Sequence, residues 1–562
     1  MSQEEKNELP KSIDLSHHLS DLAKARNVSP LKGFFKYYTP DVLALAGGVP
    51  HPDYFPFATL EASTLPVDTY SSTPGTITSP SPLAWLWNLF SSPSAARTTK
   101  ISVPKYVSDP LNEVNLATAL QYGMATGVLP LQQFLRDYSR IFYKPGFSDF
   151  TTLVHTGNTD GWSRVVYSLL NPGDSMLVEE WTYPSALSAA LPIGIHTVAV
   201  PLDSKGMRPD ALRHILSTWD SKSRGFNRPR LLYTVPIGQN PSGLTTGEER
   251  KRAIYEICVE YDIIIGEDDP YYILQEGEYI APDVRAKRAN ARKETKKKTD
   301  EEEIRAFVES LERSYLHYDY QGRVIRLDTF SKTIAPGSRL GWFTCNPMFA
   351  ERLERAGEVS TQAPSGFTQS MVTQLVVKTW GMAGYVRWLR GLRAEYTTRR
   401  DTLIDAFCKA MGVELVTEEY RNEKPGGDVW DGATVWTATL TANAGAVKGA
   451  KGVEKKVRVS FVPPTSGMFV WVKVDFSDLS PPIHVPGEEE NEGTHEGRFW
   501  VTLAKAGLLI LPGWVFRGEK EHAPIDPNKY AHYRISFSDS TVDNMDKAAK
   551  IFAKTLREYC SQ

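Results

Sequence analysis

The sequence predicts an α/β fold built around a mainly parallel sheet. From about residue 115 onward, short apolar runs alternate with stretches of helical character, and these runs predict strands at 152–155, 175–178, 197–200, 231–235, 263–265 and 324–327. Apolar runs separated by helices are typical of βα units, whose parallel strands are buried on both faces. Ligands of such sheets bind beyond the carboxyl ends of the strands. The polar residues that follow each run are therefore the first candidates for a site.

Composition narrows the class of protein further. The 562 residues suggest two or three domains, and 41% hydrophobic with 23% charged residues is the balance of a globular protein. The net charge of −3 gives no basic field for nucleic acid or an anionic membrane, so we expect neither as a partner. No apolar run reaches the length of a membrane-spanning helix.

Cysteine usage and the first residues of the chain predict the compartment. The four cysteines form no CxxC pair, which argues against zinc and redox motifs, and we expect no metal site. So few cysteines in so long a chain fit a reducing compartment. Glu4, Glu5 and Glu8 are unlike a mitochondrial presequence, which is poor in acids. We therefore expect a cytoplasmic protein.

Shifts in composition divide the chain. Residues 1–60 are expected to form an N-terminal arm with a short helix and part of a smaller domain, including a short strand and turn at 43–50. The Ser-, Thr- and Pro-rich segment 61–114 is expected to be an irregular insertion, and 115–375 the large domain. Residues 376–562 would form the small domain, with a Gly-, Ala- and Lys-rich surface insertion at 420–460.

A third insertion is expected, within the large domain. Residues 285–313 are packed with charge, including Lys296–Lys298 and Glu301–Glu303. Such runs are usually solvated helices or disordered segments, and a nuclear-import or nucleic-acid role is the alternative.

The most informative segment runs from Asp328 to Trp342. A strand ends there, and Lys332 follows among small hydroxyl residues. A lysine amine can condense with an aldehyde cofactor, while Thr329, Ser331 and Arg339 can together bind a phosphate. The alternative is a surface lysine on a Ser-rich loop, but the agreement of the whole stretch favours the cofactor site.

This segment resembles the cofactor-lysine segment of class I and II aminotransferases, which use pyridoxal 5′-phosphate (PLP) and have fold type I. Within that family, the chain is most similar to the fungal aromatic and the kynurenine/2-aminoadipate aminotransferases. The resemblance extends from about Arg26 to Asp539 and fails in 61–110, 285–313 and 420–460. It implies a large domain with a mainly parallel seven-stranded sheet between helices, a smaller α+β domain, and a homodimer with shared active sites.

The resemblance also assigns groups around the cofactor ring. In the segment Glu267–Tyr272, the aspartate before the proline is Asp269, which would pair with the pyridine nitrogen. Tyr272, three residues on, would donate a hydrogen bond to the ring 3′-oxygen. Asn240, in an Asn-Pro-Ser-Gly turn, would donate to the same oxygen and contact the substrate. A carboxylate at a turn is otherwise most often a helix cap.

Four further residues match the family's cofactor contacts. Asn158 and Thr159 open a helix after a strand, and free N–H groups at a helix start suit a phosphate. Tyr183 matches the aromatic residue that stacks on the cofactor ring, and Tyr122 the tyrosine that reaches the phosphate of the other subunit. Each tyrosine taken alone would be ordinary packing.

Substrate contacts are implied at three places. Arg534, in the alternating strand 533–538, matches the arginine that clamps the substrate α-carboxylate, for which a planar guanidinium is suited. Arg26 and Gly48 match the N-terminal part that covers the substrate pocket. The structural alternatives are a surface ion pair for Arg534 and a solvated side chain for Arg26.

Together these matches imply transamination of Phe, Tyr and Trp, or of kynurenine or 2-aminoadipate, with 2-oxoglutarate as amino acceptor. The cycle would be ping-pong, with Lys332 also acting as general base. A PLP-dependent lyase, decarboxylase or synthase would need the same lysine and aspartate. A non-enzymatic PLP-binding regulator is the other alternative, but residues 1–30 are too short for its DNA-binding module.

Overall fold

The protein is described from a computed structural model. The described residues are 9–28, 37, 39, 41–43, 45, 48–75, 98–290, 298–411, 416–419, 429–443, 454–482, 489, 491–519 and 526–561. Glu4, Glu5 and Glu8, and parts of the predicted insertions (76–97, 291–297, 420–428 and 444–453), therefore lie outside them. Across the described residues, every helix is too short or too polar to cross a lipid bilayer.

The large domain contains the predicted seven-stranded sheet. Only β11 runs antiparallel to its neighbours, so the expectation of a mainly parallel sheet is confirmed. The strands in spatial order are β3 (Thr151–His155), β11 (Gly341–Cys345), β10 (Val324–Thr329), β9 (Ile264–Asp268), β8 (Leu231–Thr234), β4 (Ser175–Glu179) and β5 (His196–Val200).

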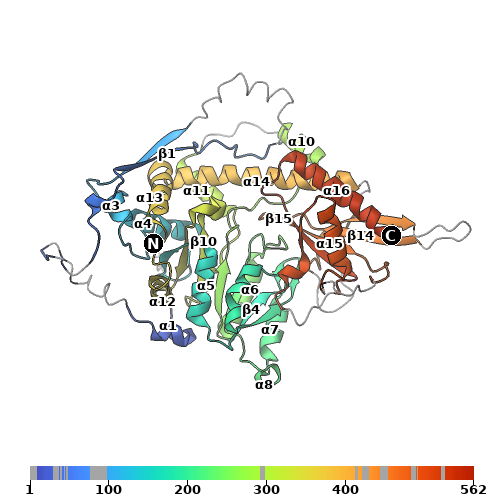
Figure 1. Cartoon of the computed structure of the whole chain (residues 1–562), viewed down its shortest axis with the longest axis horizontal. Coiled ribbons are helices and arrows are strands. Elements are labelled where there is room, and N and C mark those ends of the chain that lie inside the picture. The colour runs from blue at the N-terminus through green and yellow to red at the C-terminus, as the bar shows by residue number, and fades with distance from the viewer. Residues whose placement is uncertain are drawn as a thin grey trace, which may run out of the picture.

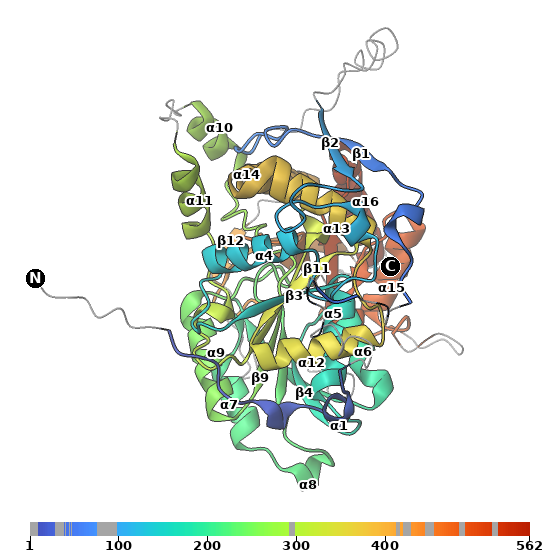
Figure 2. The same ribbon diagram turned by 90° about the vertical axis from the view of Figure 1, so that its left-hand side faces the viewer.

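Helices cover both faces of this sheet (Figure 2). A Cβ built on Gly266 would lie 2.6 Å from the Trp162 ring of α5 (Asn158–Leu169), so α5 packs on that face. The next residue, Glu267, points to the other face, where Tyr143 follows α4 (Leu129–Phe142). The remaining elements of this domain include α6 (Pro184–Ala190), β6 (Leu202–Asp203), β7 (Gly206–Met207), α7 (Pro209–Ser217), α8 (Ser221–Arg224), α9 (Glu248–Glu260), α12 (Pro347–Glu358) and α13 (Gly366–Val372).

The small domain is an antiparallel sheet covered by helices. Its strands in order are β12 (Val416–Glu419), β13 (Thr434–Asn443), β14 (Glu454–Phe461), β15 (Phe469–Asp475), β17 (Tyr530–Ser536) and β16 (Leu511–Pro512). Helices α15 (His495–Lys505) and α16 (Val542–Cys560) pack against it. The expectation of a surface insertion at 420–460 is therefore wrong for its described part, which supplies β13 and most of β14.

Helix α14 (Gly381–Met411) joins the two domains. Leu389 belongs to the hydrophobic core of the large domain, whereas Leu403 belongs to the core of the small domain. Figure 1 shows α14 running toward the C-terminal elements, which gather at one end of the molecule. The boundary between the two hydrophobic cores therefore lies within α14, between Leu389 and Leu403, and not at the start of this helix.

The N-terminal part differs from the expectation in two ways. Helix α1 (Asp21–Ala25) is the predicted short helix, but Leu15, Leu19 and Ala23 are buried in the large-domain core. In the segment expected to be irregular, β1 (Thr59–Thr64) pairs antiparallel with β2 (Thr99–Pro104). Figure 2 shows this ribbon at the upper edge of the molecule. The described residues within 43–50 are in no strand, and 44, 46 and 47 of that expected strand and turn lie outside the described residues.

The described part of the charged insertion contains two helices. A helical insertion was one of the two structures expected from its sequence; the other was a disordered segment. Helix α10 (Pro282–Asn290) precedes α11 (Asp300–Glu309). The Thr299 hydroxyl caps α11 by accepting a hydrogen bond from Glu302 N, and the Glu302 carboxylate accepts one from Thr299 N. Helix α11 also buries Phe307 and Val308 and packs on α14.

Candidate functional site

The predicted lysine lies in a cavity of about 410 Å³ beyond the carboxyl ends of the large-sheet strands. Side chains from both domains line it, because β17 and the start of β15 reach the large sheet there. Nine residues expected at the site line this cavity: Asn158, Thr159, Tyr183, Asn240, Thr329, Ser331, Lys332, Arg339 and Arg534.

Lys332 is held by the turn that follows β10. It ends the 3₁₀ helix η6 (Phe330–Lys332), which Thr329 caps by accepting a hydrogen bond from Ser331 N at 3.1 Å. The hydroxyl oxygens of Thr329 and Ser331 are 2.8 Å apart. Burial lowers the pKa of the Lys332 amine, and the positive charge of Arg534 lowers it further. Both effects favour the neutral amine, which is the nucleophilic form.

The carboxylate that faces the cavity is Asp268 and not Asp269. Asp268 Oδ1 accepts a hydrogen bond from Asn158 Nδ2 at 2.6 Å, and its Oδ2 accepts one from Tyr233 Oη at 2.7 Å. Asp269 points behind the sheet, where its Oδ2 lies 3.1 Å from Arg326 Nη1. Adjacent residues at a strand end point to opposite faces, so an assignment one position off selects the wrong face. Burial raises the pKa of Asp268.

Tyr271 and Tyr272, which follow in the chain, also lie on opposite sides of the sheet. Tyr271 lines the cavity together with Asn240. Tyr272 lies behind the sheet, where its hydroxyl donates to the Phe142 carbonyl at 3.4 Å. Burial raises the pKa of both phenols. The structure therefore places Asp268 and Tyr271 where the sequence placed Asp269 and Tyr272.

An anion-binding corner lies at the start of α5. Gly157, the residue before the helix, has a φ of 96°, and a Cβ there would lie 2.1 Å from Arg339 Nη2. Arg339 Nη2 itself donates to the Thr156 carbonyl at 2.9 Å. The free N–H groups and positive dipole of the helix start, with the guanidinium and nearby hydroxyls, form a set of donors suited to a phosphate.

Arg534 approaches from the small domain. It lies on β17, and its Nη1 donates to Asn240 Oδ1 at 2.6 Å. Its guanidinium carbon is 4.1 Å from the ring centre of Phe469 and 4.9 Å from that of Phe516. Arg534 Nε and Asn158 Oδ1 are both buried without a hydrogen-bond partner among the described residues. Both polar atoms are therefore available to a bound molecule.

Three other expected residues do not line this cavity. Arg26 follows α1, which packs on α5 and α12, and its carbonyl accepts a hydrogen bond from Arg352 Nη1 at 3.0 Å. The packing of this segment into the core holds it away from the cavity, contrary to expectation. Gly48 has no atom within 4 Å of a built Cβ, and the side chain of Tyr122 is 69% exposed.

Among the described residues, one cluster of metal-ligand residue types lies outside the cavity. His17 and His18 both approach Asp262, at 2.7 and 3.0 Å. Asp262 is already paired with Arg323 at 2.7 Å, which accounts for the carboxylate without a metal ion.

Comparison with known proteins agrees with this geometry. The family described as aminotransferase class I and II matches residues 142–421. An aromatic amino acid aminotransferase of Schizosaccharomyces pombe is 33% identical over 97% of this chain and 98% of its own length. An L-tyrosine:2-oxoglutarate aminotransferase of Serpula lacrymans is 35% identical, covering 90% of this chain and 84% of that protein. The crystal structure of aminotransferase Aro8 from Candida albicans has a TM-score of 0.75 and 32% identity, covering 98% of this chain and 99% of that one.

Proposed function

The chain belongs to the class I and II aminotransferases, and from that premise we propose that it transfers the amino group of aromatic amino acids to 2-oxoglutarate, using PLP. The observation that carries this proposal is the convergence of Lys332, Asp268, the Gly157–Arg339 corner and Arg534 on one cavity. The names of the relatives support the aromatic donors and the acceptor.

The residues of the cavity fit PLP. The space left by the missing side chain of Gly157, beside Arg339, suits the phosphate, and Asn158 and Thr159 stand at the start of the helix there. Asp268 is a buried carboxylate that can pair with a protonated ring nitrogen, and Tyr271 and Asn240 can bind a ring oxygen. Tyr183 supplies an aromatic wall.

Bound PLP supplies an aldehyde that condenses with amines and a ring that withdraws electrons from the substrate α-carbon. Lys332 Nζ removes the proton from that carbon. The lowered pKa of Lys332 favours this step because it keeps the amine neutral and able to accept a proton. Asp268 holds the proton on the ring nitrogen by its charge. Arg534 binds the α-carboxylate of donor and acceptor in turn, and Asn240 Oδ1 orients the guanidinium.

The aromatic preference has support within the cavity. Tyr183, Tyr271 and Phe469 line it together with Met468. Such a wall binds a flat apolar side chain. A panel of Phe, Tyr, Trp, kynurenine, 2-aminoadipate and Asp with 2-oxoglutarate tests this. We expect glutamate formation to be fastest with the first three donors; the fastest turnover with Asp would contradict the assignment.

The same panel separates the alternative chemistries. A transaminase releases one 2-oxo acid for each glutamate formed, whereas a decarboxylase releases carbon dioxide and a lyase needs no acceptor. A non-enzymatic regulator would bind PLP without turnover.

We also propose a homodimer in which Tyr122 reaches the site of the partner. Large apolar side chains are exposed between residues 37 and 129, among them Leu43 at 90%, Leu45 at 93% and Tyr54 at 83%. Exposed apolar side chains gathered in one part of a chain mark an interaction surface. Analytical ultracentrifugation should give the mass of two chains, and the Tyr122→Ala variant should bind PLP more weakly. A monomer with full cofactor affinity would contradict both.

A cytoplasmic location is the last part of the proposal. All four cysteines are unpaired, which fits a reducing compartment. Fractionation of cells that express the full chain should place it with cytosolic markers, and recovery with mitochondria would contradict this.

A further inference from the structure

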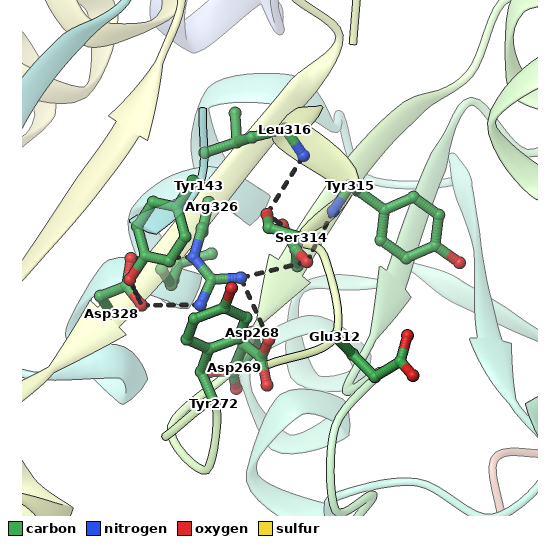
Figure 3. Close-up of polar contacts among 12 residues, drawn as sticks. Tyr143, Asp268, Asp269, Tyr272, Glu312, Ser314, Tyr315, Leu316, Arg326 and Asp328 are labelled. Atoms are coloured by element: carbon green, nitrogen blue, oxygen red, sulfur yellow. Dashed lines mark hydrogen bonds and ion pairs between the residues drawn. The ribbon is translucent and has the colours of Figure 1, made fainter. Parts of the chain in front are cut away.

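A buried arginine lies directly behind the cavity, on the far face of the large sheet. Arg326 is on β10, six positions before Lys332, and its side chain is fully buried. Figure 3 shows its guanidinium between the rings of Tyr143 and Tyr272. The guanidinium carbon is 4.0 Å and 4.6 Å from the two ring centres. This is a stacked arginine with no access to solvent.

The guanidinium binds three carboxylates from two strand ends. Nη1 lies 3.1 Å from both Glu267 and Asp269, at the end of β9. Nε and Nη2 form a two-pronged contact with Asp328 of β10, at 3.0 and 2.9 Å. One cation therefore ties β9 to β10 through charge-assisted hydrogen bonds.

The carboxylates depend on Arg326 to different degrees. Glu267 also accepts hydrogen bonds from Ser314 Oγ and Tyr315 N, and Asp328 accepts one from Tyr143 Oη at 2.8 Å. Asp269 Oδ1 is buried without a hydrogen-bond partner among the described residues. Burial raises the pKa of Asp269, and raises that of Asp328 to about 6. A second cation, Lys251, is buried nearby, but its Nζ donates to the Arg313 carbonyl at 2.6 Å.

The strands that Arg326 ties together present the site residues on their other face. In the parallel pairing of β10 with β9, Arg326 lies opposite Glu267, and Leu327 lies opposite Asp268. The Leu327 carbonyl accepts hydrogen bonds from Asn158 Nδ2 at 3.2 Å and from Asp269 N at 3.3 Å. A shift between the two strand ends would therefore move Asp268 relative to Lys332.

Building on the proposed function, we propose that Arg326 is a positioning residue: from behind the sheet, its guanidinium fixes the ends of β9 and β10 so that Asp268 and Lys332 face the cavity in register. It touches neither substrate nor cofactor. A lysine could supply the charge but not the planar fork or the stacking between two rings, so the charge alone is not sufficient.

The test compares Arg326→Lys with a matched control, Arg323→Lys. Arg323 precedes β10 by one residue, its side chain is 7% exposed, and it pairs with Asp262 at 2.7 Å, away from the cavity. Both variants keep the positive charge but lose the planar guanidinium with its fixed set of N–H donors. Three quantities are measured: the melting temperature of the cofactor-free protein, the PLP dissociation constant, and kcat and KM for Tyr.

We expect both variants to lose stability, and Arg326→Lys to lose more, because the Arg326 guanidinium contacts three carboxylates and two aromatic rings. Only Arg326→Lys should raise the PLP dissociation constant, by about tenfold, the equivalent of one charge-assisted hydrogen bond. It should also lower kcat by about tenfold to a hundredfold, the effect of misplaced reacting groups, with KM little changed. Equal PLP affinity and equal kcat in the two variants would overturn the proposal.

A second variant keeps the proposal testable if Arg326→Lys folds poorly. Arg326→Met combined with Glu267→Gln, Asp269→Asn and Asp328→Asn removes the cation and its three carboxylates together, and neutral replacement of a buried ion cluster is often tolerated. This quadruple variant should fold and still bind PLP more weakly; wild-type affinity would again overturn the proposal. Because PLP binding is measured without any substrate, this result is independent of whether the wild-type protein transaminates aromatic amino acids.

Discussion

Asp268 and Asp269 are adjacent in the chain but serve opposite faces of the large sheet. Asp268 lines the cavity that contains Lys332, whereas Asp269 contacts Arg326 behind the sheet. Only one of these two carboxylates can therefore pair with a cofactor ring in the cavity.

Conversion of each aspartate to asparagine tests this division. Asp268→Asn removes the charge that would hold the ring nitrogen protonated, so kcat should fall by at least about a hundredfold while PLP remains bound. Asp269→Asn should keep most of the activity, because Arg326 retains Glu267 and Asp328. Steady-state kinetics on both proteins decide the question, and a severe loss in Asp269→Asn with normal turnover in Asp268→Asn would reverse the assignment.

The close approach at Gly157 predicts a specific effect on cofactor affinity. Gly157→Ala places a methyl group 2.1 Å from the present position of Arg339 Nη2 and should weaken PLP binding by about tenfold or more. Gly173→Ala is the matched control, because Gly173 also has a positive φ, of 88°, but open space around it. Both variants also bear a backbone cost, because residues with a Cβ rarely adopt a positive φ of this size. Equal PLP affinity of the two variants, measured by fluorescence titration, would argue against a phosphate site at this corner.

The contact of Arg534 with Asn240 predicts the behaviour of Arg534→Lys. Lysine cannot bind a carboxylate through two parallel hydrogen bonds, so KM for both Tyr and 2-oxoglutarate should rise by about tenfold or more. Arg458→Lys, on the exposed side of β14 in the same sheet, serves as the control. A change in KM for only one of the two substrates would contradict a shared α-carboxylate site.

Glu496 predicts a pH dependence of stability in the small domain. Its Oε1 accepts hydrogen bonds from Gly513 N and His532 N, and burial raises its pKa from 4.5 to about 7. Between these two values the folded protein binds more protons than the unfolded chain, so the contribution of Glu496 to stability falls as pH rises from about 4.5 to 7.

The variant Glu496→Gln keeps an acceptor oxygen for both N–H groups but does not titrate. Relative to the wild type, its free energy of unfolding should therefore increase by up to about 3 kcal/mol from pH 4.5 to pH 8. Denaturant unfolding at several pH values measures this difference. Parallel curves for the two proteins would show that Glu496 does not titrate in that range.

Much of the large domain and most of the cavity could be predicted from the sequence. The apolar runs locate β3, β4, β5, β8, β9 and β10, because strands buried on both faces leave a continuous signal. Lys332, Asn240 and Arg339 lie in motifs whose order along the chain is informative. The choice between Asp268 and Asp269 needed the alternation of side chains along β9, where Glu267 and Asp269 share the face of Arg326.

The β13–β14 part of the small-domain sheet was missed for a different reason. Gly-, Ala- and Lys-rich composition at 420–460 suggested a surface loop, yet Val457, Val459 and Phe461 alternate as the buried face of β14. This period-two pattern was the signal that could have identified the strand. The contacts of Arg326 with Tyr143 and Glu267 join segments far apart in the chain, and no local pattern predicts them.

The proposed chemistry requires Lys332 to carry the cofactor. Borohydride reduction of the PLP-loaded protein, followed by peptide mass spectrometry, tests it directly, with Lys332→Ala as the control. We predict one pyridoxyl-phosphate label, on the peptide that contains Lys332, and no label on the variant. A label on another lysine of the wild-type protein, or an unlabelled Lys332 peptide, would contradict the account.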